Sequence, residues 1–243
     1  MKDLVGDQVD LDNIPFYGLA EVTVGGRSCV ISQTGFSGES GYEIYLRNAT
    51  LYADDMWDAV LEAGKKHNLM VIAPAHHRRI QAGILSWGQD LDHEHNPFQC
   101  NLGYQVSLSG KGEWEKKGDY IGKQALEKMK ADLKDGHKPY KLQLVGFEIG
   151  GKPIDEYAPD FWLVSPGDGG DPCGFITSPW YHPEKGKNIA MGYIPFDGTL
   201  NPNGFPKWEL GKKFKVHLPD IYADEPGVPC LLYTSDAADE LRS

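Results

Sequence analysis

The hydrophobic pattern of residues 17–46 alternates between apolar and polar positions and predicts strands. Two alternating stretches, Leu19–Val24 and Ser28–Ser32, flank Gly25-Gly26, which is the pattern of a β-hairpin. Residues 41–46 read GYEIYL and predict the next strand. The pattern then changes to a helical period, with Asn48 or Thr50 able to cap the helix. The apolar face expected for this helix consists of Met56, Trp57, Val60, Leu61 and Gly64.

A second helix is predicted after a short apolar stretch. Met70–Ile72 is that stretch, and Pro74 is well placed as the first residue of a helix that continues to about Ser86. Residues 17–90 therefore predict the element order β-β-β-α-β-α, an α+β layer.

Residues 91–139 are irregular and charged, with one helix among them. The segment DYIGKQALEKMKADLK has helical periodicity. We expect its inward positions to be Ile121, Leu126, Met129 and Leu133.

From Tyr140 onward the chain changes to short apolar segments separated by Gly and Pro turns. The segments are KLQLVGFEI, FWLVS, CGFITS, NIAMGYIP and KFKVHL. This pattern is typical of a small all-β barrel or sandwich. We therefore predict an α+β fold with two domains, residues 1–138 and a C-terminal β-barrel in residues 139–229.

The two ends of the chain do not continue these patterns. Cys230 to Glu240 resembles the translation of a transposase-type sequencing adapter. We therefore expect residues 230–243 to be a non-native tail and leave them out of the fold prediction, the alternative being a genuine short acidic tail. The chain enters a strand pattern soon after Met1, so we expect a fragment at both ends.

Composition and charge exclude several classes of protein. The 243 residues carry a net charge of −11, which argues against a non-specific nucleic-acid binder because such a protein needs a basic face. The four cysteines are far apart and form no C-x-x-C, as expected for reduced thiols in a cytoplasmic protein. The longest apolar run, LMVIAPA, is too short to cross a bilayer, so no membrane association is expected.

The stretch QTGFSGESGYEIYL places three glycines, Gly35, Gly38 and Gly41, before the carboxylate of Glu43. It lacks the ending of a phosphate-binding loop, and it precedes a strand rather than a helix. Such a loop lets a flat ligand approach the backbone, and strand alternation puts Glu43 on the face opposite Tyr42. A carboxylate there suits an aminopyrimidine edge. The alternative is an ordinary glycine-rich hairpin with a solvated Glu43.

Two polar clusters offer weaker signals. In APAHHRRIQAG, the adjacent His76 and His77 point apart on a helix, which does not favour a metal site. Arg79 lies beside the inward Ile80 and is expected to reach a partner carboxylate or an anionic ligand. The segment DLDHEHNPF has neither EF-hand nor H-E-x-x-H spacing and predicts a loop. No metal is therefore predicted.

The order of segments is more specific than any one of them. The series QTGFSGESGYEIYL, MWDAVLEAG, RRIQAGILSWGQDLD, NPFQCNLGYQV, DYIGKQAL and CGFITSPWYHPEKGKNIAMGYIP resembles the glycine cleavage T-protein (aminomethyltransferase) superfamily over residues 10 to about 220. That superfamily includes tetrahydrofolate-dependent O- and S-demethylases and the folate-binding part of sarcosine and dimethylglycine dehydrogenases.

The resemblance implies a folate site. The glycine-rich loop and the carboxylate after it would line a tetrahydrofolate pocket, with Glu43 holding the pterin edge. Phe36 stands where the family usually has a tyrosine and keeps its stacking face. The cofactor-binding residues expected from the resemblance are Glu43, Phe36, Tyr42, Arg79 and Trp87.

One departure from the family pattern bears on the reaction. The first arginine of the aminomethyltransferase helix falls on Ala75, as in the folate-dependent demethylases. The resemblance therefore implies methyl transfer from a small methylated substrate. The family's catalytic aspartate precedes this segment, so no catalytic residue is named. We expect the parent enzyme to be active and this fragment to be inactive.

Two alternatives stay open. The chain could be the folate-binding half of a sarcosine or dimethylglycine dehydrogenase-like flavoenzyme, which a dinucleotide fingerprint upstream would indicate. It could also be a non-catalytic folate-binding regulatory protein of the iron–sulfur maintenance type, although the motif K-G-C-Y-x-G-Q-E of those proteins is lacking here. The sequence indicates neither the methyl donor nor the oligomeric state.

Overall fold

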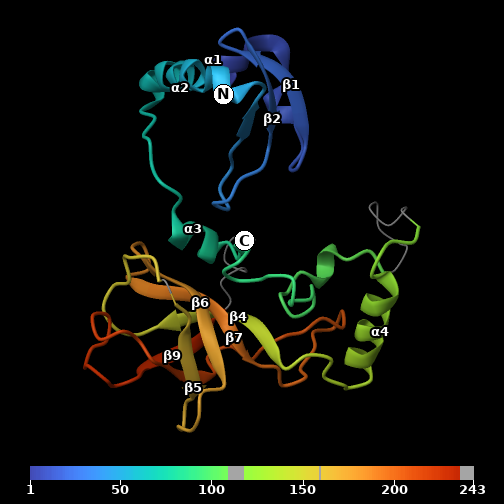
Figure 1. The fold of residues 1–243 in the computed structure, drawn as a ribbon, viewed down its shortest axis with the longest axis vertical. Coiled ribbons are helices and arrows are strands. Elements are labelled where there is room, and N and C mark those ends of the chain that lie inside the picture. The colour runs from blue at the N-terminus through green and yellow to red at the C-terminus, as the bar shows by residue number, and fades with distance from the viewer. Residues whose placement is uncertain (109–117, 159, 236–243) are drawn as a thin grey trace. The chain divides into compact units, whose positions relative to one another are not determined.

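The chain folds into two compact units (Figure 1). The structure, a computed structural model, describes residues 1–108, 118–158 and 160–235. Unit 1 is Met1–Arg78 and unit 2 is Arg79–Ser243. This α+β architecture with a C-terminal barrel confirms the predicted fold. The division between the compact units lies at Arg78, whereas the sequence pattern placed a domain boundary near residue 138.

Unit 1 is a three-stranded antiparallel sheet in the order β1-β2-β3, with helices packed on one face. Gly25 and Gly26 both have positive φ, as the predicted two-residue hairpin turn requires. The helix α2 begins after Asn48, which adopts a left-handed conformation and makes no side-chain cap. The elements are α1 (Lys2–Val5), β1 (Leu19–Val24), β2 (Arg27–Ser32), β3 (Glu43–Leu46), α2 (Ala49–Gly64), and the 3-10 turns η1 (Gly6–Gln8), η2 (Leu11–Asn13) and η3 (Lys65–His67).

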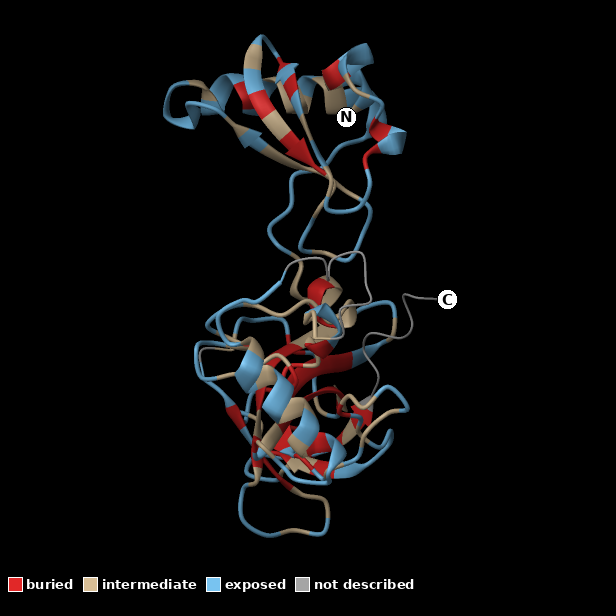
Figure 2. Cartoon of the chain, turned by 90° about the vertical axis from the view of Figure 1, so that its right-hand side faces the viewer, coloured by how far each residue is buried: buried red, intermediate tan, exposed pale blue. Residues whose placement is uncertain are grey.

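The core of unit 1 lies between the sheet and the helices (Figure 2). Val22, Cys29 and Ile31 face inward from β1 and β2, and Met56 reaches them from α2. The other face of the sheet, which carries Glu43, has no helix from unit 1 packed on it.

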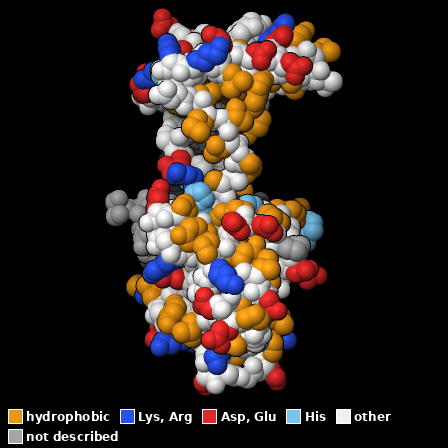
Figure 3. Space-filling view, turned by 90° about the vertical axis from the view of Figure 1, so that its left-hand side faces the viewer, with side chains coloured by type: hydrophobic (Ala, Val, Ile, Leu, Met, Phe, Trp, Pro, Cys, Tyr) orange, Lys and Arg blue, Asp and Glu red, His pale blue; other side chains and the backbone are white. Residues whose placement is uncertain are grey.

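Three predictions in the first half of the chain were wrong in detail. Met70–Ile72 forms no strand, and all three side chains are exposed, because no described strand of unit 1 pairs with them. Trp57 is exposed, because successive side chains of a helix point about 100° apart and Met56, its neighbour, is the one that faces the core. The helix α3 (His76–Gln81) is shorter than predicted, because Gly83 takes a positive φ two residues after its end. Figure 3 shows apolar side chains at the surface of unit 1.

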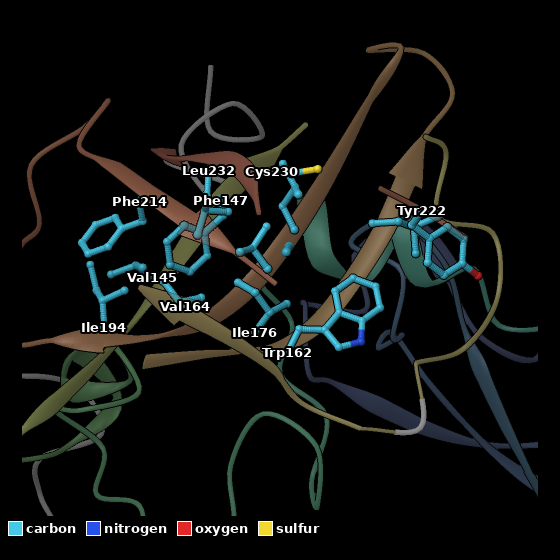
Figure 4. Packing of buried hydrophobic residues seen from close by; sticks show 14 of the residues in the cluster. Val145, Phe147, Trp162, Val164, Ile176, Ile194, Phe214, Tyr222, Cys230 and Leu232 are labelled. Carbon is cyan, nitrogen blue, oxygen red and sulfur yellow. The ribbon is translucent and has the colours of Figure 1, made fainter. Parts of the chain in front are cut away.

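Unit 2 is built on a closed antiparallel barrel in the order β4-β7-β6-β5-β8-β9. Val145, Phe147, Val164, Ile176 and Leu232 fill its interior (Figure 4). The strands are β4 (Leu142–Ile149), β5 (Trp162–Pro166), β6 (Gly174–His182), β7 (Lys187–Pro195), β8 (Lys213–Val216) and β9 (Cys230–Ser235).

The last strand lies in the segment that the sequence pattern left out of the fold. Cys230–Ser235 forms β9, which pairs with β8 on one side and with β4 on the other. Residues 236–243 lie outside the described residues. Whether 230–243 is native to the protein stays a prediction.

Outside the barrel, α4 (Lys123–Lys134) follows the 3-10 turn η4 (Gly103–Gln105). Leu133 is buried and Leu126 packs beside it, as predicted. The expectation for Ile121 was wrong, because the helix begins only after Gly122, whose φ is 87°, and Ile121 is fully exposed.

The four cysteines are unpaired, and three of them are buried. None of the helices in the described part of the chain combines the length and hydropathy that a membrane span requires.

Candidate functional site

The residues predicted to bind a cofactor divide between the two units. Glu43, Phe36 and Tyr42 belong to unit 1, and Arg79 and Trp87 belong to unit 2. The two parts of the candidate site are therefore described separately, beginning with the carboxylate.

Strand β3 presents Glu43 on the open face of the sheet of unit 1. Ile44 and Leu46 pack on the core, so Glu43 and Tyr45 must lie on the opposite face. The predicted separation of the acid from the apolar side chains is confirmed.

Only one of the two carboxylate oxygens of Glu43 accepts hydrogen bonds within the described residues of unit 1. The Thr34 hydroxyl donates a hydrogen bond to Oε2, and the Tyr45 hydroxyl donates to the same oxygen at 2.8 Å. The hydrogen bond from Thr34, followed by that from Tyr45, lowers the pKa of Glu43 below its usual value. Within the described residues of unit 1, no group donates to Oε1. That oxygen is available to a ligand donor.

The glycine-rich loop before β3 is open around its first glycine. A Cβ at Gly35 would meet no atom within 4 Å, and only Gly38 of the three glycines has a positive φ. The loop is tied to the end of unit 1 by an ion pair, in which Arg78 donates to Glu39 at 2.6 Å. Phe36 is 49% exposed within this loop.

Tyr42 lies on the packed side of the chain. Its hydroxyl donates to the carbonyl of Leu11 at 3.1 Å, and its ring contacts the core of unit 1. Because Tyr42 and Glu43 are adjacent, they point in opposite directions. The structure gives Tyr42 a supporting contact, and its role toward a ligand stays a prediction.

Arg79 is buried in unit 2 as half of an ion pair. Its Nη1 lies 2.8 Å from Oδ2 of Asp90, and both side chains are almost inaccessible to solvent. It also donates to the Ser178 hydroxyl at 2.8 Å and to the side chain of Gln89 at 3.0 Å. The sequence pattern expected a carboxylate or an anionic ligand, and the carboxylate is Asp90. Arg79 thus holds Asp90 in the interior of unit 2, and its binding of a cofactor stays a prediction.

A β-bulge in β6 completes the surroundings of Asp90. The register of β6 against β7 shifts between Ile176 and Ser178. Adjacent residues of a regular strand point to opposite faces, but the bulge allows both Thr177 and Ser178 to donate to Oδ1 of Asp90, each at 2.5 Å. The buried charge is therefore satisfied by hydrogen bonds as well as by Arg79.

Asp90 in turn fixes a tight turn that carries Trp87. The backbone amide of Ser86 donates to Asp90 at 2.8 Å, and Gly88 donates to the carbonyl of Leu91 at 2.8 Å. Trp87 is 61% exposed at this turn, and the ring of His93 meets it edge-on at 4.9 Å. The buried network thus presents an aromatic face at the surface of unit 2.

Sequence reasoning missed Asp90, Thr177 and Ser178. The available signal was Arg79 itself, because an arginine on an apolar helix face needs a buried acid. Among the described residues, no group of three or more His, Cys, Asp or Glu side chains converges as a metal site would require.

The chain is similar to known proteins in sequence and in fold. The GCVT N-terminal domain family matches residues 1–110. An aminomethyltransferase from Halothermothrix orenii is 31% identical over 191 residues, which cover 78% of this chain and 48% of that protein. An aminomethyltransferase from Alkaliphilus oremlandii is 32% identical over 202 residues, which cover 81% of this chain and 48% of the relative.

The fold is also that of a solved structure. The crystal structure of glycine cleavage system aminomethyltransferase T from Bartonella henselae matches with a TM-score of 0.64 and 18% identity. The match covers 95% of this chain and 54% of that one. The chain spans about half the length of the relatives it matches.

Proposed function

The chain belongs to the glycine cleavage T-protein superfamily, and we propose on this basis that it is part of an enzyme that transfers a one-carbon unit with tetrahydrofolate. The observation that carries the proposal is the carboxylate of Glu43, whose pKa is lowered by hydrogen bonds from two hydroxyls and whose Oε1 accepts no hydrogen bond from the described residues of unit 1.

The residues of unit 1 fit a reduced pterin. An aminopyrimidine edge offers N–H donors, and the carboxylate oxygen that Thr34 and Tyr45 leave unoccupied can accept from such an edge. Oε1 of Glu43 accepts no hydrogen bond from the described residues of unit 1, and a Cβ at Gly35 would meet no atom within 4 Å. The half-exposed Phe36 can stack on such a ring. When bound, tetrahydrofolate supplies the N5 amine that accepts the one-carbon unit.

In this proposal, the chain orients the ligand and does not itself react. Glu43 would fix the pterin edge, and the turn around Asp90 would present Trp87 as an apolar surface. Orientation of two reactants supplies a large share of the acceleration in such transfers.

The finer proposal is transfer of a methyl group from a small O-, S- or N-methylated substrate. It is supported by Ala75, a small apolar residue at the position where the resemblance places the first arginine of the aminomethyltransferases. The four unpaired cysteines support a reducing, cytoplasmic location.

Titration calorimetry of the chain with tetrahydrofolate tests the proposal. Glu43→Gln keeps the shape of the side chain but removes its charge, and we expect the affinity to fall by about 2 kcal/mol, or about 30-fold. Glu21→Gln is the matched control, because Glu21 is an exposed acid on β1 that pairs with Arg47 instead. The control should bind like the unmodified chain. Equal affinity of Glu43→Gln and Glu21→Gln would remove Glu43 from the site.

A further inference from the structure

Tyr45 lies on the same face of β3 as Glu43, two residues further along the strand. Its side chain is 56% exposed, and it is not part of the hydrophobic core of unit 1. The strand order β1-β2-β3 places β3 at an edge of the sheet, so no described strand of unit 1 lies beyond it. Packing therefore does not fix the Tyr45 ring, and the hydrogen bond of its hydroxyl determines where the ring lies.

That hydrogen bond runs back along the strand to Glu43. Alternate residues of a strand lie about 7 Å apart on one face, and a tyrosine hydroxyl reaches such a neighbour only when the ring leans along the strand. The hydroxyl of Tyr45 lies 2.8 Å from Oε2 of Glu43. The ring therefore lies beside the carboxylate and does not extend into solvent.

The two hydroxyls at Glu43 have no proton left for a ligand. An ionised carboxylate only accepts hydrogen bonds, so both Tyr45 and Thr34 must donate to Oε2. Each hydroxyl has one proton, which this bond uses, but its oxygen keeps lone pairs that can accept. A ligand that reaches Glu43 thus meets hydrogen-bond acceptors and no hydroxyl donor.

Among the described residues of unit 1, no lysine or arginine forms an ion pair with Glu43. Arg47, directly after β3, pairs with Glu21 at 2.7 Å. Arg78 pairs with Glu39 at 2.6 Å in the loop before β3. The charge on Glu43 is therefore left to attract the N–H groups of a ligand.

We infer that Tyr45 is a positioning residue of the proposed folate site, on which this inference rests: its hydroxyl holds Glu43 by Oε2, so that the site selects a ring edge with two adjacent N–H donors. One N–H would donate to Oε1 and its neighbour to the hydroxyl oxygen of Tyr45, since both side chains lie on the open face of the sheet. A ring edge that places an acceptor beside its donor would set one lone pair against another. The inference adds to the proposed function the pattern of donors that the site recognises.

Isocytosine and cytosine are suitable probes, because they are isomers of equal size and both are uncharged near neutral pH. Isocytosine presents an amino group beside a ring N–H, whereas the amino group of cytosine lies beside an acceptor nitrogen. Their binding is observed through the Glu43 signal in a chain with ¹³C-labelled glutamate carboxyl groups. We expect isocytosine to shift this signal in a saturable manner and cytosine to bind at least about tenfold more weakly.

Tyr45→Phe keeps the exposed ring and removes the hydroxyl. We expect this variant to bind isocytosine about fivefold to tenfold more weakly. In the ligand-free variant the pKa of Glu43 should rise toward its usual value, because one of its two donors is gone. Tyr52→Phe is the matched control, since Tyr52 lies on α2 and the Arg27 guanidinium covers its ring. The control should behave like the unmodified chain in both measurements.

The inference is overturned if isocytosine leaves the Glu43 signal unchanged or if cytosine binds as tightly as isocytosine. It is also overturned if Tyr45→Phe keeps the isocytosine affinity or the Glu43 pKa of the unmodified chain. Titration with tetrahydrofolate separates the two proposals. A chain that selects isocytosine but does not bind tetrahydrofolate supports the inference and contradicts the proposed function. A chain that binds tetrahydrofolate but treats the two isomers alike contradicts the inference alone.

Discussion

At the scale of single residues, the state of Glu43 is set by two hydroxyl groups. Thr34 and Tyr45 both donate to Oε2, and together they lower the pKa of the carboxyl group. Alternation along β3 was sufficient to predict which face carries this acid. It could not predict the Thr34 donor, because Thr34 lies nine residues away across a loop of irregular geometry.

Thr34→Val keeps the shape of residue 34 and removes the donor. We expect the pKa of Glu43 to rise toward its usual value, as seen by ¹³C NMR titration of the labelled carboxyl group. A lowered pKa in the folded chain stabilises it at pH values above the unfolded pKa, and this contribution is lost as the pH falls through the folded pKa. Thr34→Val should therefore lower the stability of the chain at neutral pH and make the share of its loss in acid that comes from Glu43 smaller. Thr23→Val, an exposed position on β1, is the control, and the same Glu43 midpoint in both variants would contradict this explanation.

At the scale of elements, the bulge in β6 adapts a regular strand to a buried carboxylate. It directs two successive hydroxyls, Thr177 and Ser178, to one oxygen of Asp90. Arg79 accounts for the other oxygen of the carboxylate. The turn that carries Trp87 depends on this network through the bond from the Ser86 amide.

Replacement of either hydroxyl should destabilise unit 2. We expect Thr177→Val and Ser178→Ala each to lower the free energy of unfolding by about 1–3 kcal/mol, because a buried carboxylate loses a donor. Denaturant unfolding, followed by the fluorescence of tryptophans, measures the change. Thr23→Val, at an exposed position on β1, should be close to neutral. Loss of less than about 0.5 kcal/mol in both bulge variants would show that Asp90 does not depend on them.

Patterns of neighbouring residues predicted most of the helices and strands. They did not predict contacts between residues that are far apart in the sequence. The hairpin of β1 and β2 was predicted because two glycines between alternating stretches specify it locally. Met70–Ile72 was wrongly taken as a strand, since a strand needs a partner that the pattern cannot supply. The bulge and Asp90 were missed because Thr177 and Asp90 are 87 residues apart.

At the scale of the whole molecule, closure of the barrel depends on its last strand. β9 joins β8 to β4, and Leu232 is fully buried in the core of the barrel. The sequence pattern left residues 230–243 out of the fold because their composition resembled an adapter. Closure of a barrel is a property of all its strands together, so no single segment could indicate it.

Two truncations test the part played by β9. A chain that ends at Pro229 would expose the edges of β4 and β8 and leave the space filled by Leu232 empty. We expect unit 2 in this chain to melt at a clearly lower temperature or to aggregate. A chain that ends at Ser235 retains β9 and should melt like the unmodified protein. Equal melting temperatures for both truncations would show that the barrel is stable without β9.

The most direct test of the central claim observes Glu43 itself while tetrahydrofolate is added. In a chain with ¹³C-labelled glutamate carboxyl groups, the Glu43 signal is assigned by its absence in Glu43→Gln. If this carboxylate binds the pterin edge, the signal should shift in a saturable manner and its pKa should fall further, because donors then reach Oε1 as well as Oε2. An unchanged Glu43 signal and pKa at saturating tetrahydrofolate would contradict the account.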